Sequence, residues 1–348
     1  MLEYLYSLAT DKKKGLIALF LKAILFFLSL IYGAFIRLLI CLSLLKRRRL
    51  PLKVISVGNI TLGGTGKTSL VEFIAATLKD RAHKVAILSR GYKKQEGDIG
   101  DEPAMLQEKL PGIKVIADKN RINSANKAAD SGIDTVILDD GFQQWGIIKD
   151  LDIVVINVLQ PFGNFQMIPR GILREPVSSL RRAGIFILTK SNLVPDTQNI
   201  RQMLNKVNPS AEIFESTHAP VGFYSIDNKD TLISGASLAS NAVVIFSGIG
   251  DPDSFESLIR SQGLDIGLSL KFADHHNYSI GDLDRIINCA REKKLDTIIT
   301  TEKDAVRLKT LIPLNLAPQG ARILVFKIKL IIKNEEKFIS RLLRIYTS

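Results

Sequence analysis

The segment from Lys53 to Lys79 constrains the fold more than any other part of the chain, because it joins a strand, a glycine-rich turn and a helix. The strand pattern covers Lys53 to Val57, and the helical pattern covers Ser69 to Lys79. Such a unit is typical of a parallel sheet covered by helices, where backbone N–H groups of the turn surround phosphate oxygens. We therefore expect an α/β fold of the phosphate-loop class with a mostly parallel sheet.

The turn itself predicts the nucleotide contacts. Its proposed nucleotide-binding residues are Thr61, Leu62, Gly63, Gly64, Thr65, Gly66, Lys67, Thr68 and Ser69. Lys67 would reach the β and γ phosphates of ATP, and the Thr68 hydroxyl would bind Mg²⁺. Thr61 stands where the strict pattern has glycine. The core of the turn resembles the variant loop of MinD-like ATPases, although Leu62 replaces their signature lysine.

A second strand pattern, from Ile133 to Leu138, ends in Asp139-Asp140-Gly141. Carboxylates at the carboxyl end of a parallel strand lie beside the phosphate loop, where they hold Mg²⁺ directly or through water. Asp139 and Asp140 are therefore predicted metal ligands together with Thr68.

The apolar run from Leu16 to Leu45 predicts a helix at a membrane surface. Residues 1–50 hold nine Lys or Arg against Glu3 and Asp11, so they carry seven of the twelve net positive charges. A basic flank beside an apolar run favours an anionic lipid surface over nucleic acid. The uninterrupted part, Ala23 to Ile36, is 14 residues, about 21 Å as a helix against a hydrocarbon core of ~30 Å. This favours a helix lying in or dipping into the interface, with a true span as the alternative.

Several further motifs resemble the tetraacyldisaccharide 4'-kinase family, and they occur in the family's order between residues 54 and 308. They are Val57 to Thr61, Ser89 to Tyr92, Gly100 to Pro103, Asp139 to Gln143, Pro161 to Asn164, Leu173 to Pro176, Phe272 to His276 and Thr300 to Asp304. The resemblance implies transfer of the ATP γ-phosphate to the 4' hydroxyl of a tetraacylated glucosamine disaccharide 1-phosphate. It also implies a place at the cytoplasmic face of the bacterial inner membrane. The chain has two cysteines without disulfide or zinc spacing, which fits a reducing, cytoplasmic setting.

The resemblance implies specific site residues. Asp101 resembles the base that takes the hydroxyl proton, paired with a histidine from the second domain, and Lys67 completes the catalytic set. His275 is the predicted partner and His276 the alternative; such a pair would require the two domains to close over the substrate. The residues that resemble the family's substrate contacts are Arg90, Tyr92, Arg121, Gln143, Arg174 and Glu175.

The rest of the chain predicts two domains. Strand patterns at 85–88, 114–117, 135–138, 153–157 and 185–189 alternate with helical patterns, which is typical of a parallel sheet. We expect a membrane-associated helix with basic flanks at 1–50, a phosphate-loop kinase domain at 51–210, a β-hairpin connector at 211–238 and a smaller α/β domain at 239–348.

Two positions depart from the family pattern. Gln144 stands where the family commonly has histidine, so a charge near pH 7 is missing there. Arg170 stands in a Pro-Arg-Gly sequence where Pro-Ala-Gly is usual. The main alternative function is a membrane-associated regulatory ATPase of the MinD-like class, but it lacks its lysine at position 62 and gives no role to Asp101 or His275. A nucleotide-gated scaffold without chemistry is a third reading. No protein partner is implied.

Overall fold

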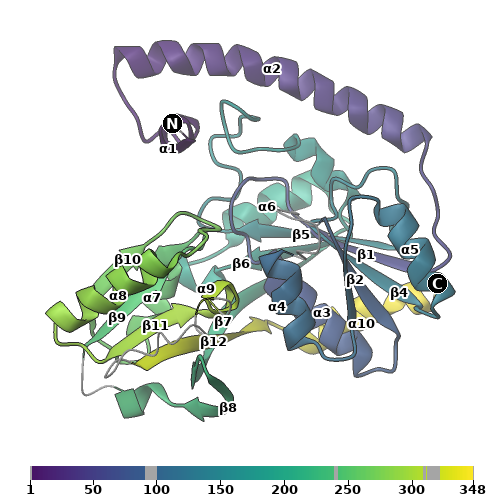
Figure 1. The fold of residues 1–348 in the computed structure, drawn as a ribbon. Coiled ribbons are helices and arrows are strands. Elements are labelled where there is room, and N and C mark those ends of the chain that lie inside the picture. The colour runs from purple at the N-terminus through teal and green to yellow at the C-terminus, as the bar shows by residue number, and fades with distance from the viewer. Residues whose placement is uncertain (1, 91–99, 239–241, 309–310, 312–321, 348) are drawn as a thin grey trace. The chain divides into compact units, whose positions relative to one another are not determined.

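The computed structural model describes residues 2–90, 100–238, 242–308, 311 and 322–347, drawn as a ribbon in Figure 1. They fall into two compact units. The first contains Met1–Tyr92, Leu110–Thr217 and Ile332–Ser348, and the second contains Lys93–Lys109 and His218–Ile331.

The first unit is built on a parallel sheet with the strand order β7-β6-β5-β1-β4-β2-β3. Its strands are β1 (Lys53–Gly58), β2 (Val85–Ser89), β3 (Lys114–Ala117), β4 (Thr135–Asp139), β5 (Leu151–Asn157), β6 (Ile185–Thr189) and the start of β7 (Glu212–Ser225). β1 is central, with Val57 opposite Asp139 of β4 and Gly58 opposite Val154 of β5. The carboxyl ends of β1 and β4 therefore lie side by side.

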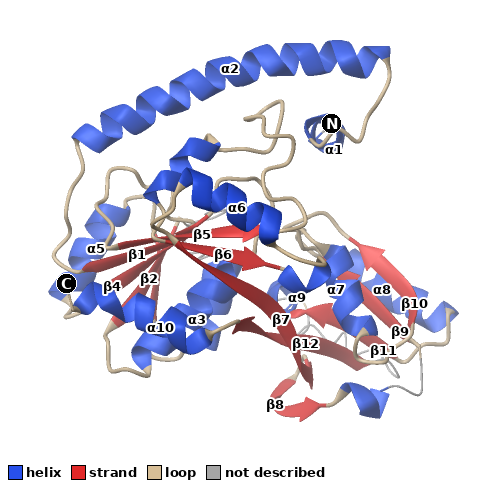
Figure 2. Cartoon of the chain, turned by 180° about the vertical axis from the view of Figure 1, so that it is seen from behind, coloured by secondary structure: helices blue, strands red, loops and turns tan. Residues whose placement is uncertain are grey.

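Helices cover both faces of this sheet. They are α3 (Lys67–Lys79), α5 (Arg121–Asp130), α6 (Gln198–Val207) and α10 (Glu335–Leu343). α6 lies on one face and α3 and α10 on the other (Figures 1 and 2). Leu204 of α6 packs with Val154 and Phe186, and Phe338 of α10 packs on Phe73 with ring centroids 6.1 Å apart. Every central strand is buried on both faces, so the strands consist of nearly continuous Val, Ile and Leu.

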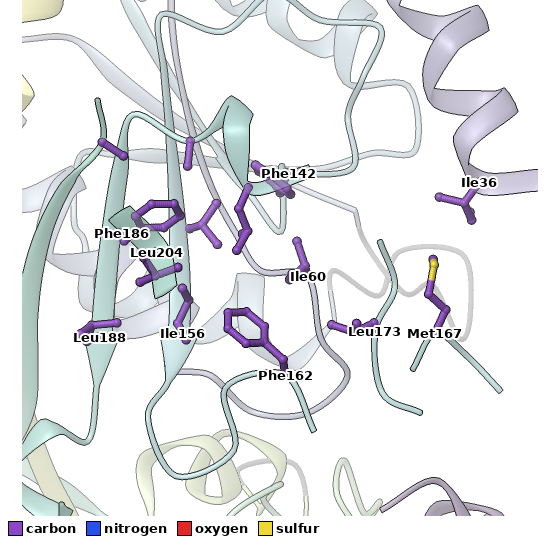
Figure 3. Close-up of a cluster of buried hydrophobic side chains, with 14 residues drawn as sticks. Ile36, Ile60, Phe142, Ile156, Phe162, Met167, Leu173, Phe186, Leu188 and Leu204 are labelled. Atoms are coloured by element: carbon purple, nitrogen blue, oxygen red, sulfur yellow. The ribbon is translucent and has the colours of Figure 1, made fainter. Parts of the chain in front are cut away.

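α1 (Leu2–Ala9) and α2 (Leu16–Leu45) precede the sheet. α2 is buried only at Ala18, Ser29, Gly33 and Ile36, a narrow stripe of mostly small residues that faces the protein. Figure 3 shows Ile36 near Met167 in a core cluster that also contains Leu173 and Phe142. α2 continues without a break through Lys22 and Arg37, and its 30 residues correspond to about 45 Å of straight helix.

The second unit has the strand order β10-β9-β11-β12-β7, all parallel from β10 to β12, and β8 pairs antiparallel with β7. Its strands are β8 (Asn228–Ile233), β9 (Val243–Ser247), β10 (Ile266–Lys271), β11 (Thr297–Thr301) and β12 (Arg322–Ile332). Its helices are α4 (Asp101–Lys109), α7 (Pro252–Arg260), α8 (Ile280–Glu292) and α9 (Glu302–Leu308). α7 packs with Ile245 and α8 with Val244, so these helices cover opposite faces.

The predicted fold class is confirmed, since every expected strand is present within one or two residues and the hairpin of β7 and β8 occupies the expected connector. The boundaries of the compact units differ from the domain boundaries expected from the sequence. α4 joins the second unit because it packs on α9, and α10 joins the first because Phe338 packs against Phe73 and Phe214.

Candidate nucleotide-binding and catalytic sites

The phosphate loop connects β1 to α3 and leaves an open space at its glycines. Gly66 caps α3 with φ 85° and Gly63 has φ 106°, values that L side chains rarely adopt. A Cβ atom added to Gly63 or Gly64 would meet no atom within 4 Å. The Thr65 hydroxyl is buried and has no hydrogen-bond partner among the described residues. These features fit a cradle for phosphate oxygens at the N-terminus of a helix.

Close packing behind the loop brings the two aspartates to it. A Cβ added to Gly58 would lie 2.6 Å from Cβ of Phe142, and one added to Gly141 would lie 2.5 Å from Cβ of Leu138. Only glycine fits at both positions, so the ends of β1 and β4 approach each other directly. Asp139 and Asp140 are thereby held beside the phosphate loop.

Asp140 is surrounded by cations. Arg174 binds both of its carboxylate oxygens at 2.8 Å, and the Lys67 ammonium lies 3.7 Å from Oδ1. Burial raises the pKa of Asp140, but the hydrogen bonds from Arg174 and the charges of Lys67, Arg174 and Arg121 outweigh it and lower the pKa to about 2. Asp140 is therefore ionised at any pH near neutrality.

Asn59 links these groups, although it was not selected as a site residue from the sequence. It is fully buried. Its side-chain oxygen accepts from Lys67 at 3.4 Å and from Arg174, and its backbone oxygen accepts from Gln143 at 3.0 Å. The signals in the sequence are its place in the motif from Val57 to Thr61 and its position directly after β1, where a polar side chain follows the apolar ones.

Two of the predicted substrate contacts are engaged inside the protein. Arg121 is 3% exposed and donates to the backbone oxygens of Asp139 at 2.6 Å and Asp140 at 3.3 Å. The Glu175 carboxylate is fully buried and accepts hydrogen bonds from three side chains. The donors are Gln143 at 2.9 Å, Trp145 at 3.1 Å and Arg182 at 2.8 Å. Both side chains are therefore held by protein partners in this structure.

The remaining predicted substrate residues differ in position. Arg174 lies at the phosphate loop, where its backbone N–H donates to Ile60 at 2.7 Å. Arg90 is exposed directly after β2. Tyr92 lies outside the described residues.

The predicted metal ligands are grouped at one edge of the sheet. Thr68 is 7% exposed at the first turn of α3, and Asp139 is 4% exposed at the end of β4. One hydroxyl and two carboxylates suit Mg²⁺, which takes few protein ligands and fills its shell with water and phosphate oxygens. Within the described ranges, no three His, Cys, Asp or Glu residues form a group that could hold a metal alone.

The second unit contains Asp101 and His275. Nδ1 of His275 lies 3.9 Å from Oδ2 of Asp101, and Arg307 lies between them, with Nε 2.6 Å from Oδ2 of Asp101 and Nη2 3.2 Å from Nδ1 of His275. His276 instead contacts Asp282 at 3.2 Å, next to the capping box of α8. Of the two histidines, the structure therefore places His275 beside Asp101.

This arrangement differs from the expected one in an important respect. The family resemblance implied that Asp101 and its histidine come from different domains, whereas α4 belongs to the same compact unit as His275. Ion pairs of Lys109 with Glu302 at 2.7 Å and of Lys303 with Glu102 at 2.5 Å join α4 to α9. Arg307 was not selected from the sequence, because an arginine three residues after Asp304 looks like an ordinary helix surface residue.

α2 presents an exposed apolar face and also contacts the phosphate-loop site. Its most exposed apolar side chains are Leu16, Ile17, Leu19, Phe20, Phe27, Ile31 and Leu45. By length and composition, α2 qualifies as a candidate membrane span. On its other side, the Tyr32 hydroxyl donates to the backbone oxygen of Arg174 at 3.2 Å.

Comparisons with known proteins identify the family of the chain. A family model described as tetraacyldisaccharide-1-P 4'-kinase matches residues 21–347. A tetraacyldisaccharide 4'-kinase from Halothermothrix orenii is 38% identical over 321 residues, covering 82% of this chain and 83% of the relative. One from Anaeromyxobacter dehalogenans is 35% identical over 306 residues, covering 82% of this chain and 79% of the relative.

A solved structure is also similar to the chain. It is LpxK from Aquifex aeolicus in complex with ATP, with a TM-score of 0.70 and 27% identity, covering 93% of this chain and 99% of that one. Family model, relatives and fold all agree with the motifs. The chain therefore belongs to the tetraacyldisaccharide-1-P 4'-kinase family, the kinases of lipid A biosynthesis.

Proposed function

We propose that this kinase transfers the γ-phosphate of ATP to the 4' hydroxyl of a tetraacyldisaccharide 1-phosphate at the cytoplasmic face of the inner membrane. One observation carries the proposal: the Tyr32 hydroxyl joins the apolar helix α2 to Arg174, which in turn binds Asp140 at the phosphate loop. A kinase for a lipid needs its phosphate-transfer residues next to a surface that contacts lipid. The relatives are named for this substrate.

ATP is assigned to the loop from Thr61 to Ser69. Backbone N–H groups and the Thr65 hydroxyl would hold phosphate oxygens in the open space at Gly63 and Gly64. Lys67 would neutralise charge that develops between the β and γ phosphates. The ATP complex of the Aquifex aeolicus protein supports this assignment.

Mg²⁺ is assigned to Thr68, Asp139 and Asp140. When bound, the ion supplies charge neutralisation for the phosphates. Arg174 holds both carboxylate oxygens of Asp140 in the structure. We propose that Arg174 exchanges this carboxylate for a phosphate group when the substrates bind, since a guanidinium pairs well with either anion.

Asp101 is assigned as the base and His275 as its partner. Phosphoryl transfer needs little covalent chemistry from the protein, but a sugar hydroxyl reacts faster when a carboxylate takes its proton. Arg90, Tyr92 and Arg174 are assigned to the headgroup, while Arg121, Gln143 and Glu175 support the site through the hydrogen bonds described above.

The membrane surface is assigned to the outer face of α2 and its basic flanks. Burying one exposed phenylalanine contributes about 1.5–3 kcal/mol, so Phe27→Glu is expected to weaken binding to vesicles with anionic lipid at least about tenfold. Leu232→Glu on β8, a change of the same kind at an exposed site, serves as the control. Equal vesicle binding by both variants would show that the exposed face of α2 does not contact the membrane.

Purified protein incubated with ATP, Mg²⁺ and tetraacyldisaccharide 1-phosphate tests the activity. We expect a bisphosphorylated lipid, with no product from Asp101→Ala although that variant still binds ATP. A regulatory ATPase would instead hydrolyse ATP without phosphorylating lipid, and that result would reject the kinase proposal.

A further inference from the structure

Arg307 occupies the centre of the Asp101–His275 cluster, and every nitrogen of its guanidinium has a partner. Its side chain is 3% exposed. Nε contacts Asp101 at 2.6 Å, Nη2 contacts His275 at 3.2 Å, and Nη1 contacts the Gly248 carbonyl at 2.9 Å and Asp304 at 3.0 Å. A long cationic side chain buried with this many contacts is fixed in one position.

Building on the kinase function proposed above, we propose that Arg307 is a positioning residue that bridges Asp101 and His275 and holds His275 as the neutral ring with its proton on Nε2. Asp101 and His275 then act as a unit through the guanidinium and share no direct hydrogen bond.

The hydrogen-bonding chemistry of arginine determines the tautomer of His275. A guanidinium only donates, so Nδ1 of His275, 3.2 Å from Nη2, must accept through its lone pair. The proton of the ring is then on Nε2. Nδ1 and Oδ2 of Asp101 are 3.9 Å apart, which is too far for a direct hydrogen bond.

The surroundings of Arg307 keep it in place. Asp304 is fully buried and accepts from Gly248 N–H at 3.1 Å, Tyr278 at 3.1 Å and Thr301 at 2.7 Å, so its orientation is fixed. Burial raises the pKa of Asp304, and the hydrogen bond from Thr301 and the charge of Arg307 oppose this. Arg307 is thus held from behind by Asp304 and Gly248 while it faces the two functional residues.

His275 is fixed through its backbone as well. It has φ 58°, and its N–H donates to the same Gly248 carbonyl that Arg307 contacts, at 3.1 Å. Its ring is half exposed, with Nε2 3.9 Å from the carboxylate of Asp274. The charged groups that face the ring are therefore Asp101, Arg307 and Asp274.

Two consequences follow for the reaction. Oδ2 of Asp101 is taken by Arg307, so Oδ1 receives the proton as the O–H bond of the sugar breaks. The hydroxyl oxygen then bonds to the γ phosphorus while the bond from this phosphorus to the β–γ bridging oxygen breaks, and ADP leaves with that electron pair. His275 donates from Nε2 to an oxygen of the substrate and does not itself take the proton.

Nitrogen NMR of the full-length protein with ¹⁵N-labelled histidine tests the tautomer directly. The chain has four histidines, and the His275→Gln variant assigns the relevant signals. We expect Nε2 of His275 to be protonated and Nδ1 to be unprotonated and to accept a hydrogen bond. A proton on Nδ1 would overturn the proposal. This measurement needs neither ATP nor lipid, so its result is independent of the kinase assay.

Kinetics of Arg307→Met, which keeps the bulk of the side chain and removes its donors, test the positioning. We expect kcat to fall about 10²-fold, the scale of misplaced catalytic groups, with the KM for ATP unchanged and the Nδ1 signal shifted to that of an unbonded nitrogen. Arg307→Lys should restore part of kcat, because one ammonium can still reach one of the two partners.

Lys109→Met is the matched control. It removes another ion pair between α4 and α9, at Glu302, without touching Asp101 or His275, and should keep the kcat of the unaltered enzyme. A folded Arg307→Met enzyme with the kcat of this control would overturn the proposal. If Arg307→Met does not fold, the NMR signals of the unaltered protein and of Arg307→Lys still decide it.

Discussion

Arg174 places its guanidinium flat against the carboxylate of Asp140, with Nη1 2.8 Å from Oδ2 and Nη2 2.8 Å from Oδ1. The strand segment that carries Arg174 also pairs with the start of the phosphate loop, since Leu62 N–H donates to Ile172 O at 2.8 Å. Arg174 and the phosphate loop are therefore joined both through the carboxylate of Asp140 and through one short stretch of backbone.

Asp140→Asn should raise the Mg²⁺ concentration needed for half-maximal kinase activity by about tenfold or more, on the scale of lost ligand-shell groups. The amide keeps the shape of the side chain but has no charge for a hard cation or for Arg174. A titration of activity with Mg²⁺ at saturating ATP measures the change. An unchanged Mg²⁺ requirement would exclude Asp140 from the metal site.

The lowered pKa of Asp140 predicts how stability depends on acid. Its folded-state value is about 2, below the ordinary 3.8, so ionised Asp140 stabilises the fold above pH 3.8 and this contribution is lost as pH falls from 3.8 to 2. Urea unfolding of the unaltered protein should therefore show a steeper loss of stability in this window than Asp140→Asn. If the unfolding free energies of the two proteins fall in parallel with pH, Asp140 does not contribute to the acid dependence of stability.

Glu175→Gln tests whether Glu175 supports the site or binds substrate. The carboxylate is fully buried among Gln143, Trp145 and Arg182, and the change leaves the Arg182 cation without its charged partner. We expect a loss of about 2–4 kcal/mol in unfolding free energy. Glu212→Gln, which alters partly exposed pairs with Lys337, Arg341 and Arg344, should cost about 1 kcal/mol or less. A stable Glu175→Gln protein with a raised KM for lipid would favour substrate binding.

Arg170→Ala introduces the alanine that the family commonly has at this position. The change should weaken the attachment of the N-terminal hairpin, formed by α1 and α2, to the loop that carries Arg170. Arg170 binds Asp11 between α1 and α2, with Nη2 2.9 Å from Oδ1. Lys22 also contacts Asp11 at 2.6 Å, so only part of the attachment is lost. Hydrogen exchange of the amides in α1 should become faster, with no change in α3. Equal exchange in α1 would show that this ion pair does not hold the hairpin.

The local patterns of the chain determined most of the fold. The strands from β1 to β6 are runs of Val, Ile and Leu bounded by turns, and Leu16–Leu45 is one helix from end to end. The phosphate loop and the Asp139-Asp140-Gly141 turn were also predictable, since the register of parallel strands brings their carboxyl ends together.

The roles of single polar residues could not be predicted in the same way. Arg121 and Glu175 are predicted substrate contacts, and the sequence did not show that both are buried among protein partners. The placement of α4 in the second unit was also not predictable, because it depends on ion pairs with α9, about 200 residues later in the chain.

By itself the sequence determined an α/β fold with a phosphate loop and one long apolar helix, and its resemblance to the kinase family predicted that Asp101 pairs with a histidine. Only the tertiary structure decided that His275 lies beside Asp101, that Arg307 lies between the two residues, and that Arg174 holds Asp140. The physical reason is that secondary structure follows from local periodicity, while a charged side chain takes whichever distant partner the packed fold brings within hydrogen-bonding distance.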